Sequence, residues 1–249
     1  MRKFIITLLM CLTIQAVTRA EIGDTFKANT VEGVEMAFHI IGIDEVEVMC
    51  LDAYYETAID GETEGAVTIP NEINGYRVTR IGMHAFKGCS KVTSFVLPNS
   101  IEAIDEYAFA ECRGITSIIF PECIREIGDC AFIGCDGLRF IYVEAPKPYE
   151  IPSSVFITYT SSKFHPYLYA MVYVPKGSAS LYKETSGWNR FRHIIEMEPT
   201  GIKSCMPSDE CPHELLRFTI DGQRAERRSK GINVMRMSDG SIRKIINRK

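Results

Sequence analysis

The sequence predicts an α/β solenoid: a short stack of coils with one parallel strand per coil, an N-terminal β cap and a small C-terminal β-hairpin tail. The first observation is a near-repeat with a 23-residue period, whose three regular copies align on an Ala-Phe dipeptide ending at Phe86, Phe109 and Phe132. Such a period is typical of solenoids, because one unit cannot bury its apolar face alone and stacking buries it. The second observation is a short apolar run that follows each dipeptide at one spacing.

Several positions of the repeat are apolar or Cys in every copy, and we expect them to point into the core. They are positions 78, 81, 85, 86, 89, 92, 95 and 97, with their equivalents 23 and 46 residues later. In the apolar run, Phe95 and Leu97 alternate with Ser94 and Val96, which is the period of a strand. Pro98 ends this strand, because proline cannot donate a ladder hydrogen bond. Stacked copies therefore predict a parallel sheet.

The repeat pattern Ile-Gly-x-x-Ala-Phe-x-Gly-Cys-x-x-Leu-x-x-Ile-x-Phe-Pro resembles the leucine-rich repeat of the BspA-like surface proteins of Bacteroidetes and other host-associated microbes. The resemblance runs from about Glu21 to Glu196, with three full repeats and two divergent ones. It implies a leucine-rich-repeat stack and adhesion to extracellular matrix or to other cells.

The N-terminus predicts export. Residues 1–20 have a basic start at Arg2 and Lys3, an apolar core from Phe4 to about Val17, and Ala20 before the expected cleavage site. These are the features of a secretory signal peptide, and the core is too short to span a bilayer comfortably. We therefore expect an exported protein, at the cell surface or extracellular, with no transmembrane span in the mature chain.

Four segments are expected along the chain: the signal peptide at 1–20, an acidic N-terminal β cap at 21–65, the repeat solenoid at 66–197, and a linker with a basic β-hairpin tail at 198–249. Residues 21–72 carry thirteen carboxylates and one lysine, which we interpret as a solvated face. Residues 222–249 hold nine Lys and Arg against two acidic residues. The tail resembles C-terminal segments of exported Bacteroidetes proteins, some of them sorting signals, and its role is left open. No nucleic-acid partner is expected, because the rest of the chain is acidic.

Eight cysteines remain after Cys11 of the signal peptide. Cys89, Cys112 and Cys135 hold one inward repeat position, so we expect buried free thiols there. Cys123 with Cys130, and Cys205 with Cys211, are candidate disulfide pairs whose state the sequence leaves open. Cys205, Cys211 and His213 lack the paired spacing of a zinc site, so no metal is expected.

The period fails after the third copy, where an insert at 157–170 contains Tyr159, Phe164, Tyr167 and Tyr169. A short helix is expected over 180–185, and Trp188 with Phe191 and Ile194 is expected to close the far end of the stack. Whether the aromatic insert covers or extends the neighbouring strand surface is left open.

Catalytic motifs are missing from the sequence. The five histidines lie in unrelated contexts, and neither a Gly-x-Ser-x-Gly, a His-Glu-x-x-His nor a phosphate loop occurs. Paired carboxylates could hydrolyse glycosides, but an open stack of short coils offers no deep cleft to shift their pKa values. We therefore expect no enzyme and no cofactor.

The outward strand residues indicate a binding surface. One expected row runs Thr68, Val96, Ile119, Tyr142, Tyr173, and its neighbour runs Ala66, Ser94, Ser117, Phe140, Met171. Small side chains give way to aromatic ones along the stack, and exposed apolar patches usually mark contact sites. The candidate ligand-binding residues are thus Ile119, Phe140, Tyr142, Met171 and Tyr173. The expected function is binding of a host protein or a glycan. The alternative functions are a self-associating structural protein of the cell envelope and, as a third hypothesis, a hydrolase. The oligomeric state is left open.

Overall fold

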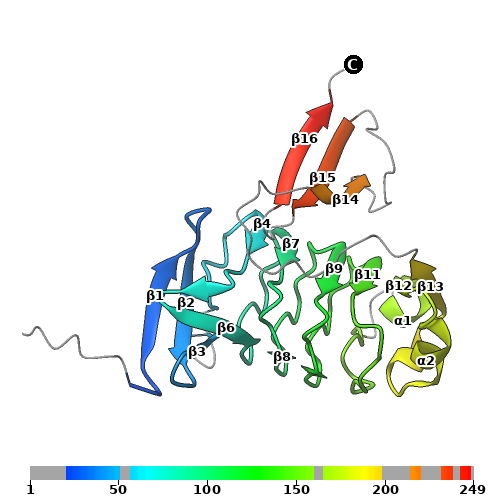
Figure 1. The fold of residues 1–249 in the computed structure, drawn as a ribbon, viewed down its shortest axis with the longest axis horizontal. Coiled ribbons are helices and arrows are strands. Elements are labelled where there is room, and N and C mark those ends of the chain that lie inside the picture. The colour runs from blue at the N-terminus through cyan, green and yellow to red at the C-terminus, as the bar shows by residue number, and fades with distance from the viewer. Residues whose placement is uncertain are drawn as a thin grey trace, which may run out of the picture.

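A computed structural model describes residues 21–50, 57–159 and 165–197 in full, and the backbone of three strands between 214 and 247. Figure 1 shows successive coils lying side by side between the N-terminal strands β1–β3 and the helix α2. Parallel strands in successive coils, expected from the sequence, are confirmed.

One set of strands forms the side of the stack that the sequence singled out. β9 (Ser117–Phe120), β11 (Phe140–Val143), β12 (Met171–Pro175) and β13 (His193–Met197) form a four-stranded sheet in the order β13-β12-β11-β9, and every pair is parallel. β4 (Gly65–Thr68) and β7 (Val92–Val96) form a separate parallel pair. The expected continuous sheet is thus divided between β7 and β9.

The expectation of one strand per coil is wrong, because a second sheet runs through the same coils. Its hydrogen-bonded order is β1 (Thr25–Asn29), β2 (Glu35–Ile40), β3 (Glu45–Val48), β6 (Tyr76–Ile81), β8 (Ala103–Ile104) and β10 (Glu126–Ile127), with β5 (Glu72–Ile73) paired to β6. β8 and β10 are two residues long, so they are too short to show a strand alternation in the sequence. β1–β3 are antiparallel to one another, and β3 joins the coils through a parallel pairing with β6.

A third set of backbone hydrogen bonds links the turns that carry the Ala-Phe dipeptides. Alternate amides donate to the next coil: Phe86 N to Ala108 O at 2.7 Å, and Phe109 N to Ala131 O at 2.8 Å. The amides of His84 and Tyr107 do the same. Each coil is therefore joined to its neighbour on the turn side as well as through its strands.

The core is built around a column of phenylalanine rings, one per coil. The rings of Phe86, Phe109, Phe132 and Phe156 stack with centroid separations of 5.2, 5.0 and 5.3 Å, and all four side chains are fully buried. Phe95 packs against Phe109 from the strand side at 4.9 Å. The inward assignment of the Ala-Phe dipeptide is confirmed. We call these four rings the Phe column.

The three repeated cysteines are buried free thiols, as predicted. The Cys112 thiol donates to the carbonyl oxygen of Phe86 at 3.0 Å, and that of Cys135 donates to Phe109 O at 3.1 Å. Burial raises the pKa of the Cys89 thiol to about 11 from 9.0, and it raises the pKa of Cys112 and Cys135 as well. The Cys112 and Cys135 thiols are thus more than small core residues, because each donates a hydrogen bond to a buried carbonyl of the preceding coil.

The other candidate disulfide partners differ in setting. Cys123 is exposed and Cys130 is half-buried, and both are free thiols in this structure. Cys205 and Cys211 lie outside the described residues, so their pairing stays a prediction.

The far end closes around Trp188, which is fully buried. α2 (Ala179–Glu184) is the expected short helix, and the 3-10 helix η1 (Trp188–Arg190) places the indole where its Nε1 donates to Tyr149 O at 2.8 Å. Gly187 precedes it with φ +83, and a Cβ there would lie 2.1 Å from Ile151 O. Only glycine fits this closing turn.

The aromatic insert divides between the core and the surface. From the short helix α1 (Pro166–Tyr169), the Tyr167 ring packs against Phe156 at 6.0 Å and Phe191 at 4.8 Å and is 7% exposed. Tyr159, in contrast, is 42% exposed and donates its hydroxyl to Glu111 Oε1 at 3.0 Å. Residues 160–164 lie outside the described residues.

The C-terminal region contains three further strands. β14 (Glu214–Thr219), β15 (Gly231–Met237) and β16 (Ile242–Asn247) form an antiparallel sheet in sequence order. The predicted boundaries of the four segments of the chain stay predictions.

Candidate functional site: the strand face

The register of the strands brings all five predicted site residues together. Tyr142 pairs with Ile119 on β9 and with Tyr173 on β12, and Tyr173 pairs in turn with Ile195 on β13. The neighbouring row runs through Phe140 and Met171. The strand face consists of an outer row, Ile119, Tyr142, Tyr173 and Ile195, and a second row, Ser117, Phe140, Met171 and His193.

Tyr142 and Tyr173 stand next to each other as the alternation of side chains along a strand requires. Their rings are stacked, with centroids 4.9 Å apart and planes 11° from parallel. Burial raises the pKa of both phenols above the usual value, and that of Tyr142 the more strongly. At neutral pH the pair is therefore an uncharged aromatic surface.

Exposure along the strand face is uneven. Met171 is 38% exposed and Ile195 39%, whereas Tyr142 is only 7% exposed. Ile119, Phe140 and Tyr173 are half-buried. The expectation that every outward strand residue is accessible is wrong for Tyr142 and for Val96, which is 8% exposed. Strand alternation fixes the direction of a side chain, but the neighbours decide how much water reaches it.

Sequence reasoning missed two members of the strand face, Ile195 and His193. Both lie on β13, which extends the sheet one strand beyond the last one expected. The signal was present, because Ile195 follows Tyr173 at a spacing of 22 residues, close to the 23-residue period. The segment was interpreted as closing the stack, and its strand character was therefore overlooked.

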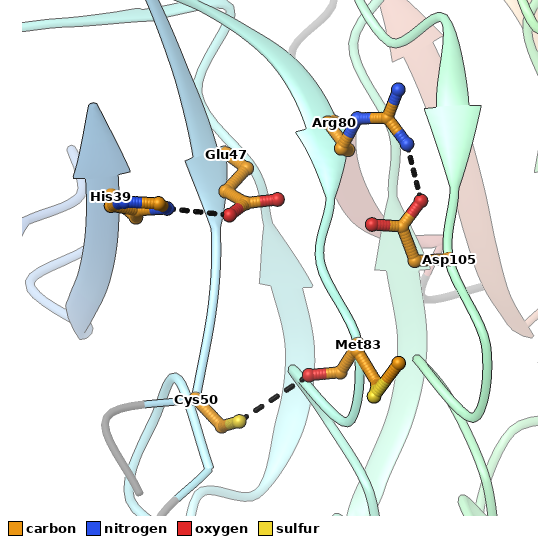
Figure 2. Close-up of polar contacts among 6 residues, drawn as sticks. All are labelled: His39, Glu47, Cys50, Arg80, Met83 and Asp105. Carbon is orange, nitrogen blue, oxygen red and sulfur yellow. Dashed lines mark hydrogen bonds and ion pairs between the residues drawn. The ribbon is translucent and has the colours of Figure 1, made fainter. Parts of the chain in front are cut away.

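A row of charged side chains crosses the second sheet (Figure 2). His39 Nδ1 on β2 lies 2.7 Å from Glu47 Oε1 on β3, and Arg80 on β6 forms an ion pair with Asp105. Farther along, Arg77 bridges Glu45 at 2.6 Å and Glu102 at 3.4 Å. These pairs connect β2 to β3 and the N-terminal strands to the coils. Part of the acidic charge is thus paired with basic side chains in a network on the surface.

The titratable side chains of the described residues do not meet the needs of a metal site. No cluster of three or more His, Cys, Asp or Glu able to hold a metal ion occurs there. Of the histidines, His39 pairs with Glu47, His84 lies against the Tyr107 ring, and His165 bonds to the Thr158 hydroxyl at 2.6 Å. His213 lies outside the described residues.

In the part of the chain that the structure describes, no helix is long and apolar enough to cross a membrane. The signal peptide predicted over residues 1–20 lies outside that part.

The stacked parallel strands, the 23-residue period and the column of rings define a leucine-rich-repeat protein. Residues 66–166 match a family model described as the BspA type leucine rich repeat region (6 copies). This match confirms the expected family resemblance for these residues. The match is narrower than the resemblance expected from about Glu21 to Glu196.

Three solved structures are similar to this chain. A leucine-rich repeat protein of T. pallidum has 18% identity and a TM-score of 0.37, covering 73% of this chain and 83% of its own. A leucine rich cell surface protein of Faecalibacterium prausnitzii has 20% identity and a TM-score of 0.29, covering 55% and 38%. A leucine-rich repeat protein of Bacteroides ovatus has 14% identity and a TM-score of 0.27, covering 75% and 80%. No curated protein matches the chain.

Proposed function

We propose that this chain is a non-catalytic binding protein, exported to the cell surface or secreted, that recognises a partner through its strand face. The observation that carries the proposal is the stacked pair Tyr142 and Tyr173, continued by exposed Met171 and Ile195. Tyrosine is favoured at binding hot spots, and contiguous exposed apolar side chains usually mark contact surfaces. The repeat stack acts as a rigid solenoid platform, and β1–β3 act as its cap.

The composition of the strand face favours a host protein over a glycan as the partner. Its two rows contain apolar side chains and tyrosines, with Ser117 and His193 as the other polar members. Interface cores are depleted of charged residues and enriched in Tyr and Met. A sugar, in contrast, needs hydrogen-bonding groups beside each ring. An apolar loop or helix of a protein therefore fits this surface better.

The test is an extracellular-matrix protein array probed with the purified mature chain, followed by affinity measurements on variants. Tyr173→Ala removes a half-buried ring of the strand face and is expected to weaken binding about thirtyfold, equivalent to about 2 kcal/mol. Ser94→Ala, on β7 outside the four-stranded sheet, is the matched control and is expected to leave affinity unchanged. Equal affinities for both variants would place the binding surface elsewhere.

Self-association is the second candidate, because among the described strands β13 is the last of its sheet and presents Ile195 beside an edge. Edge strands with exposed apolar residues are prone to pair with another chain. Light scattering over a range of concentrations separates the candidates: a mass that doubles with concentration, and that Ile195→Lys returns to monomer, favours self-association.

A further inference from the structure

A second aromatic surface lies on the turn side of the stack. His84, Tyr107 and Cys130 occupy one repeat position in three successive coils, and we call them the turn row. The His84 and Tyr107 rings are 5.3 Å apart, and Tyr107 is 38% exposed. Cys130, the third member, is half-buried. The strand-face hypothesis uses none of these residues.

The backbone of the turn row is held in a conformation that side chains rarely adopt. φ is +58 at His84, +56 at Tyr107 and +56 at Cys130. The amides of His84 and Tyr107 donate to Glu106 O and Asp129 O of the next coil, which explains why the backbone is fixed there. Glycine would adopt this conformation at no steric cost, whereas other residues cost roughly 1–2 kcal/mol each. Strain of this kind is a reason to look for a function in the side chains.

The carboxylates around the turn row are already oriented by neighbouring donors. Asp129 accepts a hydrogen bond from the Ser154 hydroxyl. Glu111 accepts from Tyr159 at 3.0 Å and lies 3.4 Å from an Arg113 nitrogen. A carboxylate has about four lone-pair sites, so these groups keep acceptor capacity for further donors. Arg113 partly compensates the charge of Glu111, which favours a neutral ligand over a cationic one at that carboxylate.

Tyr159 brings the insert to this surface. Its ring lies against Gly134, where an added Cβ would be 2.9 Å from Tyr159 Cε2. The ring is 42% exposed, and Met83 beside His84 is 50% exposed. The turn side therefore combines exposed rings with oriented carboxylates.

We propose that the turn row binds a neutral oligosaccharide chain that runs along the stack, with the faces of Tyr107 and His84 against the sugar rings. Asp129 and Glu111 accept hydrogen bonds from the sugar hydroxyls. The rise between coils, given by the ring separations of 5.0 to 5.3 Å in the core and 5.3 Å in the turn row, is similar to the length of one pyranose unit in an extended chain. Successive sugars thus meet equivalent positions on successive coils.

The experiment measures the affinity of the mature chain for glucose, cellobiose, cellotetraose and cellohexaose, together with a neutral-glycan array and heparin. Affinity is expected to increase with chain length, and Tyr107→Ala is expected to lower it about tenfold, which corresponds to about 1.4 kcal/mol. Tyr173→Ala is the matched control, because it alters the strand face and should leave glycan affinity unchanged.

Thermal unfolding checks that each variant is folded, and His84→Ala provides a second variant of the row. Three outcomes would overturn the proposal: no neutral glycan binds, only heparin binds, or folded Tyr107→Ala and His84→Ala variants keep full affinity. Loss of protein binding by Tyr173→Ala with retained glycan binding would show that the two surfaces act independently.

Discussion

The Phe column and the outer row of the strand face are both ladders with one side chain per coil, yet they differ in composition. The column repeats a single residue type from Phe86 to Phe156, and every ring is fully buried. The outer row changes from Ile119 through Tyr142 and Tyr173 to Ile195, and its exposure varies along the stack. The same backbone spacing thus supports a uniform interior and a graded exterior.

The difference shows where the sequence is constrained by packing. An interior ring must fit between two identical rings about one coil apart, and close-packed cores tolerate little change in volume. An outward side chain meets its ladder neighbours on either side and solvent above. Composition can therefore vary on the exterior at little cost in stability, which is what a recognition surface requires.

The largest expected effect tests the interior ladder. Phe109→Ala removes the ring stacked between Phe86 and Phe132 and is expected to lower the free energy of unfolding by about 3–5 kcal/mol, as large-to-small changes in packed interiors do. Chemical denaturation measures it. Phe109→Leu, which keeps most of the apolar volume, is the control and should cost clearly less. A loss below about 1 kcal/mol for the alanine variant would contradict the interior role.

Tyr142 tests whether the exterior ladder contains a packed member. Because this ring is 7% exposed and stacked on Tyr173, Tyr142→Ala is expected to cost about 1–3 kcal/mol of stability, within the range of destabilising point mutations. Tyr142→Phe removes only the hydroxyl, so the difference in stability between the Phe and Ala variants measures the contribution of the ring. If the alanine variant melts at the wild-type temperature, the ring contributes nothing to the packing of the sheet.

The buried thiols give a pH-dependent test of the interior. Their pKa is raised by burial, to about 11 from 9.0 for Cys89, so the folded chain retains protons that the unfolded chain releases near pH 9. The unfolded state then binds fewer protons, and stability falls as pH rises above 9. Each such thiol contributes a loss of about 1.4 kcal/mol per pH unit.

Denaturation at about pH 8 and about pH 10 measures this slope. Cys112→Ala should reduce the dependence of the free energy of unfolding on pH by the contribution of one thiol. This expectation is independent of the effect of the substitution on stability at neutral pH. Cys123→Ala removes an exposed thiol and is the matched control. An unchanged slope for Cys112→Ala would mean that its thiol ionises equally in both states.

The smallest expected effect lies at the exposed end of the exterior ladder. Met171 is 38% exposed, so Met171→Ala should change the free energy of unfolding by no more than about 0.5 kcal/mol, as surface substitutions generally do. Denaturation under the same conditions as for Phe109→Ala makes the comparison direct. A loss comparable to that of Tyr142→Ala would show that the second row is packed rather than presented to a partner.

The sequence predicted the parts of the molecule that repeat. Phe109 and Cys112 were assigned inward from the 23-residue period alone, and the pairing of Tyr142 with Tyr173 followed from strand register. The two-residue strands β8 and β10 were not predicted, because two residues are too few to show a periodicity. The thiol donation from Cys112 to Phe86 O depends on a contact between coils, which composition does not reveal.

The sequence predicted where the residues of the candidate site lie, but it did not predict how exposed each side chain is. Ile119, Phe140, Tyr142, Met171 and Tyr173 lie together on the strand face, but the 7% exposure of Tyr142 depends on packing around it that no alternation pattern encodes. The positive φ that His84 and Tyr107 share was not predicted, because tyrosine is not a residue type that marks this conformation, although histidine is enriched in it.

The hydrogen bonds between neighbouring coils, on the turn side and through the strands, lie along the axis of the stack. They run from coil to coil, so a force that draws the two ends of the stack apart opens one interface at a time. Each released coil of 23 residues lengthens the chain by roughly 70–80 Å before the next interface bears the load. We expect the stack to yield stepwise under tension, while the coils that remain closed keep their side-chain ladders in register.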